Sequence, residues 1–221
     1  MSEPMVKVCG LMQRDDARHA AGAGADFLGA ILSAGFPRSV AATTARGFTG
    51  PQGPPLVAVL VNETVAAAAS MADAAGASVI QLHGDETPGM LDDLRGSGEW
   101  KVWKAVRPRS VDELRRVVAR YAEHVDALLL DGWHPNARGG AGTRVSWDLI
   151  ESVREELPEG TVLVLAGGLT PENVGEAVRR LRPDVVDVSS GVEAQVGRKD
   201  PARVERFIQA ARGAAAARGL R

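Results

Sequence analysis

Eight short apolar runs, rich in β-branched residues, recur along the whole chain, and they restrict its fold more than any other feature. Each run is followed by a stretch with helical periodicity. Strands that alternate with helices at this spacing predict βαβ units and a parallel sheet. The predicted strands are residues 5–9, 27–32, 56–61, 78–83, 100–106, 126–131, 161–167 and 184–190.

The stretches between these runs supply the helices. Two of them carry start signals: Ser110 stands three residues before Glu113, and Thr170 precedes Pro171 and Glu172. The stretch 40–48 has the weakest helical pattern. The predicted helices are residues 15–25, 40–48, 64–77, 88–96, 110–122, 146–157, 170–181 and 200–214.

Eight strand and helix units in 221 residues predict an α/β fold, a single-domain (β/α)8 TIM barrel over residues 1–221. Each unit would have about 27 residues, so the loops are short. A doubly wound open sheet is the alternative. It is disfavoured because no G-x-G-x-x-G follows the first strand and an eighth unit has no place in its strand order. The Ala- and Arg-rich tail is expected to fray from about residue 214.

Composition excludes several classes of protein. The single cysteine among 221 residues rules out an internal disulfide and favours a reducing, cytoplasmic location. The net charge of −2, with basic and acidic residues interspersed, argues against a nucleic-acid partner. No apolar run approaches the ~18 residues of a membrane span, and the first residues lack the basic and apolar regions of a secretory signal. We therefore expect neither nucleic-acid nor membrane partners.

Active sites of TIM barrels form at the carboxyl ends of the strands, so the residues at those ends are candidates for chemistry. Glycines follow the last two strands: Gly167 and Gly168 after the seventh, and Gly191 after Ser189 and Ser190 at the eighth. Backbone amides freed by glycine, together with a short helix after the eighth strand, can bind an anion. We predict a phosphate site formed by Gly167, Gly168, Ser190 and Gly191, since ordinary turn glycines would explain only one of the two loops.

Cys9 ends the first strand and Asp131 ends the sixth. Cys9 is either a buried structural thiol or a reactive thiolate in a partly exposed, electropositive position. Asp131 either caps the next loop or lies partly desolvated, which would raise its pKa and suit it to donate a proton. Together they could form a general base facing a general acid.

Arg38, His83 and Arg107 complete the charged residues at the strand ends. Arg38, beside Pro37, suits a planar carboxylate, although an exposed surface arginine is the more common fate. His83 could serve as a metal ligand, orient another group or pack in the core. The four histidines show no metal-ligand spacing, so we expect no metal and no cofactor.

The segments "KVCGL", "FPRSV", "QLHGDE", "LLLDG", "GGAGTRVSWDL", "LAGGLTPENV" and "VDVSSGVE" together resemble the phosphoribosylanthranilate isomerase family of tryptophan biosynthesis. The resemblance implies an Amadori rearrangement of an aminoaldose into an aminoketose. It implies that Asp131 protonates the furanose ring oxygen and that Cys9 removes the C2 proton. It further implies that Arg38 binds the anthranilate carboxylate and that Asp187 contacts a sugar hydroxyl. We place His83 with them in the substrate-binding set.

Two segments depart from the family pattern. In the loop after the sixth strand, Ala141 lacks the usual hydroxyl and Arg144 stands near the usual lysine. The segment before Arg38 is shorter and less basic than usual, so the carboxylate contact is less well supported than the phosphate site.

Two other functions stay open on the sequence. One is a different sugar-phosphate isomerase or epimerase, which could need a divalent metal. The other is a barrel that binds a phosphorylated metabolite without turnover. In each case the partner is a small phosphorylated molecule, and the protein is a monomer or a homodimer.

Overall fold

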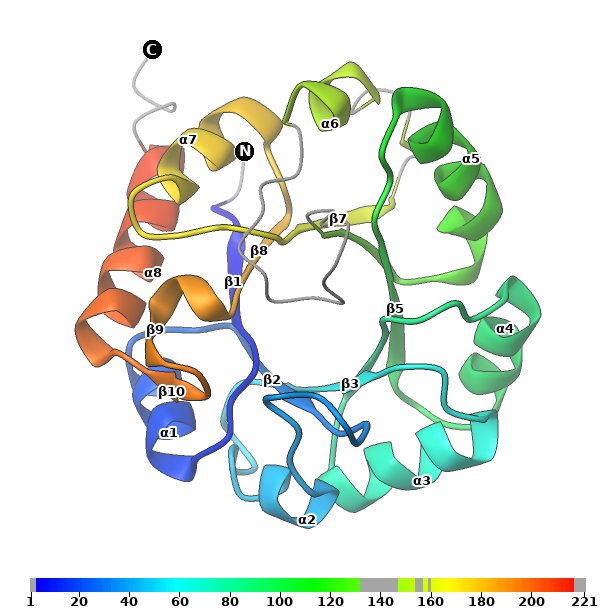
Figure 1. Ribbon diagram of the computed structural model, residues 1–221, viewed down its shortest axis with the longest axis horizontal. Coiled ribbons are helices and arrows are strands. Elements are labelled where there is room, and N and C mark those ends of the chain that lie inside the picture. Colours follow the sequence, from blue (N-terminus) through cyan, green and yellow to red (C-terminus); the bar gives the residue numbers. More distant parts are fainter. Residues whose placement is uncertain (1–2, 132–146, 154–156, 159, 217–221) are drawn as a thin grey trace.

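The structure, a computed structural model, describes residues 3–131, 147–153, 157–158 and 160–216. Its eight parallel strands form a closed barrel in which each strand pairs with the next and β8 pairs with β1. The helices lie around the outside of the barrel (Figure 1). The predicted (β/α)8 barrel is confirmed. The strands are β1 Met5–Val8, β2 Phe27–Ile31, β3 Leu56–Leu60, β4 Val79–Leu82, β5 Lys101–Val106, β6 Ala127–Leu130, β7 Val162–Leu165 and β8 Val185–Val188.

Several helices begin where a side chain can accept a bond from a free backbone amide. The side chains of Thr64, Thr87 and Ser110 each accept from the N–H three residues further on, at 3.2, 3.4 and 3.2 Å. The last of these confirms the start signal at Ser110. The helices are α1 Arg14–Gly22, α2 Ala42–Ala45, α3 Val65–Ala75, α4 Pro88–Gly96, α5 Val111–Tyr121, α6 Trp147–Val153, α7 Val174–Leu181 and α8 Pro201–Ala216.

Three helices differ from the sequence prediction. The weakest, α2, has only 4 residues. α7 begins at Val174 rather than at Thr170, because Asn173 accepts a bond from the Thr170 amide (2.8 Å) and donates to the Gly168 carbonyl (2.9 Å). These bonds form a turn before the helix. α8 continues to Ala216, past the residue at which we expected the tail to fray.

Alternation along the strands divides the buried side chains into two layers. Side chains on one face pack inside the barrel, and those on the other pack against the helices. The interior layer includes Cys9, Val79, Trp103 and Val185. Lys7, Gln81 and Asp187 lie two residues from members of this layer, so they share the interior face.

A small hairpin follows β8 and was not predicted from the sequence. A three-residue 3-10 helix, Ser190–Val192, leads into β9, Glu193–Gln195, which pairs antiparallel with β10, Arg198–Lys199. Gly197 turns the chain with a φ of 77°. The hairpin places Glu193 and Lys199, both buried, beside Arg38 in the loop after β2 and Ser189 at the end of β8.

Candidate active site

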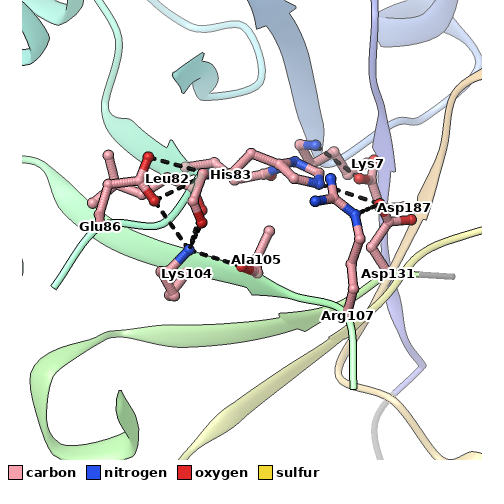
Figure 2. A network of polar contacts seen from close by, with 11 residues as sticks. Lys7, Leu82, His83, Glu86, Lys104, Ala105, Arg107, Asp131 and Asp187 are labelled. Carbon is pink, nitrogen blue, oxygen red and sulfur yellow. Dashed lines mark hydrogen bonds and ion pairs between the residues drawn. The ribbon is translucent and has the colours of Figure 1, made fainter. Parts of the chain in front are cut away.

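Asp131 lies at the carboxyl end of β6, where two side chains form hydrogen bonds with its carboxylate. Its Oδ2 accepts bonds from Arg107 Nε at 3.1 Å and from His83 Nε2 at 3.2 Å. Gln81 donates to His83 Nδ1 at 3.1 Å, which leaves Nε2 as the protonated ring nitrogen. Figure 2 shows His83 and Arg107 converging on the carboxylate. His83 therefore orients Asp131, one of the three roles we left open for it.

The protonation state of Asp131 differs from our expectation. Burial alone would raise the pKa of Asp131, but His83 and Arg107 bring it below its ordinary value. The prediction of a raised pKa was wrong, because the sequence does not show that a histidine and an arginine from neighbouring strands would bind the same oxygen. The lowered pKa favours the carboxylate form of Asp131.

Cys9 lies at the end of β1, with 7% of its surface exposed. Gly29 on β2 makes room for it: a Cβ at Gly29 would lie 2.7 Å from Sγ. Burial raises the pKa of the Cys9 thiol above its ordinary value, while Lys7 opposes that rise and Asp187 adds to it. Cys9 is therefore a buried thiol, and it lacks the exposed, electropositive position of the second alternative that we left open.

Lys7 and Asp187 form an ion pair inside the barrel that sequence reasoning missed. Lys7 is completely buried, and its Nζ donates to Asp187 Oδ2 at 2.9 Å. The other oxygen of Asp187, Oδ1, is buried without a hydrogen-bond partner. The signal was present in the sequence, because alternation placed Lys7 on the same face as Cys9.

Arg38 is buried rather than exposed, and it is bound to Glu193 on the hairpin. Its Nε and Nη2 each donate to one oxygen of Glu193, both at 2.7 Å. Lys199 Nζ donates to the same carboxylate at 3.0 Å. The surface-arginine alternative is wrong. A substrate carboxylate at Arg38 stays a prediction, and it would have to use donors that Glu193 does not occupy.

The two glycine-containing loops lie next to each other at the ends of β7 and β8. Gly167 and Gly168 have φ angles of 86° and 67°, which favour glycine. A Cβ at Gly191 would overlap the carbonyl oxygen of Leu169, so this glycine lets the two loops approach closely. Ser190 is half-buried at the start of the 3-10 helix. Phosphate binding by these residues stays a prediction. Ala141 and Arg144 lie outside the described residues.

In the part of the chain that the structure describes, no helix is long and apolar enough to cross a membrane. Among the same residues, no group of three or more His, Cys, Asp or Glu side chains is placed to hold a metal.

Comparisons with known proteins agree with this geometry. The family model for N-(5'phosphoribosyl)anthranilate (PRA) isomerase matches residues 6–210. The N-(5'-phosphoribosyl)anthranilate isomerase of Pelobacter propionicus is 38% identical over 210 residues, 94% of this chain and 95% of that protein. A crystal structure of the Thermotoga maritima isomerase superposes with a TM-score of 0.85 at 33% identity, covering 95% of this chain and 99% of that one.

A second solved structure holds a ligand. It is a phosphoribosyl anthranilate isomerase in complex with reduced 1-(o-carboxyphenylamino)-1-deoxyribulose 5-phosphate. Its TM-score is 0.82 at 32% identity, covering 95% of this chain and 99% of that one. Together with the match over residues 6–210, these likenesses show that the chain belongs to the N-(5'-phosphoribosyl)anthranilate isomerase family.

Proposed function

We propose that Cys9 is the general base and Asp131 the general acid with which this enzyme isomerises N-(5'-phosphoribosyl)anthranilate in tryptophan biosynthesis. Family membership supplies the reaction, an Amadori rearrangement of the aminoaldose to 1-(2-carboxyphenylamino)-1-deoxyribulose 5-phosphate. The observation that carries the assignment is the placement of an oriented carboxylate and a buried thiol at the ends of β6 and β1, two strands that are not neighbours in the barrel.

The first step needs a proton. Protonated Asp131 gives its proton to the ring oxygen, the bond from C1 to that oxygen breaks, and the nitrogen lone pair forms a C1=N Schiff base. The Cys9 thiolate then takes the C2 proton: an S–H bond forms, the C2–H pair becomes the C1=C2 bond, and the C=N pair returns to nitrogen. The resulting enolamine becomes the ketone as C1 gains a proton and the C2 hydroxyl loses one.

The resting protonation states are the reverse of those that the reaction uses. The pKa of Asp131 is lowered despite burial, and the pKa of Cys9 is raised by burial. The active form, with the proton on Asp131, is therefore a minor species at neutral pH. His83 and Arg107 favour the carboxylate product of the first transfer, which helps Asp131 to release its proton.

Arg38, His83 and Asp187 remain the proposed substrate-binding residues, and the loops after β7 and β8 the proposed phosphate site. His83 already shares a hydrogen bond with Asp131, so it would contact the substrate beside that carboxylate. A reaction without metal or cofactor, a monomer or homodimer, and a cytoplasmic location also stay predictions.

The test compares Cys9→Ser and Asp131→Asn with the wild type on substrate made in situ from anthranilate and phosphoribosyl pyrophosphate. Each variant should lose at least ~10²-fold in kcat with little change in KM, as expected for general acid–base groups. A chelator should leave the wild-type rate unchanged, whereas a metal-dependent isomerase would lose activity. A folded Cys9→Ser protein with kcat within a few-fold of wild type would refute the base assignment.

A further inference from the structure

Lys7 is the least expected residue in the barrel interior. Lysine is almost never fully buried unless it is paired, because the ammonium loses its hydration. Lys7 is 0% exposed and lies in the middle of β1, directly opposite Asp187 in the pairing of β1 with β8. None of the chemical steps assigned above uses it.

The ammonium of Lys7 interacts with two acidic groups. It donates to Asp187 Oδ2 at 2.9 Å. Cys9 stands two residues further along β1 on the same face, and the two side chains interact. Burial lowers the pKa of Lys7, but Asp187 and Cys9 together raise it above its ordinary value. Lys7 is therefore a cation that both groups share.

Asp187 is only half satisfied in this arrangement. Its Oδ1 is buried and accepts no hydrogen bond, although an unsatisfied buried acceptor costs about 1–3 kcal/mol. A hydroxyl donor that reaches Oδ1 would remove this cost and would share the negative charge of the carboxylate. The charge of Lys7 would then be more available to Cys9.

We propose that Lys7 is a positioning residue of the isomerase reaction, one that binds Asp187 and supports the negative charge of the Cys9 thiolate. The proposal rests on the proposed role of Cys9 as the base. Cys9 gives its proton to water before it acts, and Lys7 remains an ammonium throughout, so no proton passes through Lys7. A ligand hydroxyl that donates to Asp187 Oδ1 favours this ionisation.

Other charged groups also face Cys9. They are Asp187 on β8, Lys199 on β10 and Arg38 in the loop after β2. Lys199 and Arg38 both bind Glu193, so their positive charge is partly neutralised. Among these charges, Lys7 has the largest influence on the thiol, and it lies two residues before Cys9 on the same face of the chain.

The test uses the thiol itself as the probe, since Cys9 is the only cysteine in the chain. The rate of Cys9 alkylation by iodoacetamide is measured against pH in Lys7→Met and in Asp187→Asn. Lys7→Met should slow alkylation at pH 7.5 by at least about threefold, because the thiolate loses its cation. Asp187→Asn should speed it by a similar factor, because the competing anion is gone.

The two substitutions should change the alkylation rate in opposite directions, which separates this role from a merely structural one. If the pair only held the barrel together, both substitutions would loosen the site in the same way and shift alkylation in the same direction. The double variant Lys7→Met/Asp187→Asn leaves no buried unpaired charge, so it keeps the test available if Lys7→Met does not fold. Its alkylation should be slower than in the wild type, because Lys7 influences the thiol more than Asp187 does.

A matched control is Lys104→Met/Glu86→Gln, which alters a buried lysine and carboxylate outside the barrel wall and should leave alkylation unchanged. The second readout is the pH dependence of kcat/KM. Its alkaline limb should move to higher pH in Lys7→Met, in parallel with the pKa of the Cys9 thiol. An unmoved thiol titration in Lys7→Met and the double variant would overturn the role of Lys7 alone. Full activity of Cys9→Ser would instead overturn the base assignment, and with it the purpose of Lys7.

Discussion

Two buried lysine–carboxylate pairs lie on opposite sides of the barrel wall, and they are built differently. Outside the wall, Lys104 Nζ donates to Glu86 Oε2 at 3.0 Å and to the carbonyls of Gly84 and Ala105 at 2.8 and 2.9 Å. Glu86 in turn accepts from the amides of Gly84 and Asn62. Every oxygen of this carboxylate has a partner.

The pair inside the wall is incomplete. Lys7 reaches Asp187 Oδ2, but Oδ1 has no partner, and Gln81 Oε1 on the interior face of β4 also has none. These are the only buried side-chain polar atoms without a partner among the residues that the structure describes. Figure 2 shows the complete pair at the left of the network and the incomplete pair at the right, with Asp131 close to Asp187.

The difference indicates which pair is structural and which serves the site. The bonds of Lys104 and Glu86 fix the loop after β4, which carries His83 at its start. A fully satisfied pair has nothing left to offer a ligand. An unpartnered acceptor in the interior of an otherwise satisfied protein is a cost that a bound hydroxyl can remove.

The largest expected effect of this difference is on stability. Glu86→Gln should lower the free energy of unfolding by about 2–4 kcal/mol, because the new NH₂ group must face a backbone amide or Lys104. Asp187→Asn also leaves a buried lysine without its carboxylate, but it should cost less than Glu86→Gln, because its NH₂ can take the place of the unpartnered Oδ1 while its oxygen keeps the bond to Lys7. Urea denaturation at pH 7 measures both. Equal losses would mean that the unpartnered oxygen has a partner in solution.

The order reverses for substrate binding. Asp187→Asn should raise KM about five- to tenfold, the loss expected for one charge-assisted hydrogen bond. Glu86→Gln should leave KM within about twofold at temperatures where it is folded, because Glu86 lies outside the barrel. Steady-state kinetics on both purified variants gives the comparison. A larger KM change in Glu86→Gln would show that the loop after β4, and not Asp187, controls binding.

The incomplete pair also shows how far the sequence leads. Apolar, β-branched runs predicted all eight strands within two residues at each end, and the rule that barrel sites form at the carboxyl ends of strands placed Cys9, His83, Arg107 and Asp131 together. Alternation along a strand follows from backbone geometry, so it can be read without knowing any neighbour. The same reasoning, applied to the first and last strands together, could have paired Lys7 with Asp187.

What the sequence did not predict are contacts between distant segments. Arg38 and Glu193 are 155 residues apart, and the hairpin that brings them together has strands of only 3 and 2 residues. The pKa of Asp131 is lowered because His83 and Arg107, which follow β4 and β5, both bind one of its oxygens. Such contacts arise from the closed barrel and its register, which a pattern along one chain does not contain.

The smallest expected effect concerns the complete pair in acid. Although burial raises the pKa of Glu86, Lys104 and two backbone amides lower it below its ordinary value. A carboxyl with a lowered pKa in the folded protein adds stability that is fully present above its unfolded pKa of about 4.3 and is lost as the pH falls through its folded pKa. The wild type should therefore lose more stability on acidification than Glu86→Gln does.

Urea denaturation between pH 7 and pH 4 tests this difference. The gap between the wild type and Glu86→Gln should narrow toward pH 4, by no more than about 1 kcal/mol, since one proton is worth at most about 1.4 kcal/mol per pH unit. Both proteins should still weaken in acid, because the pKa values of Asp131 and Glu193 also fall below their ordinary values despite burial. A gap that stays constant or widens would show that Lys104 stabilises Glu86 no better in the folded protein than water does in the unfolded chain. The outer pair would then contribute through its backbone hydrogen bonds alone.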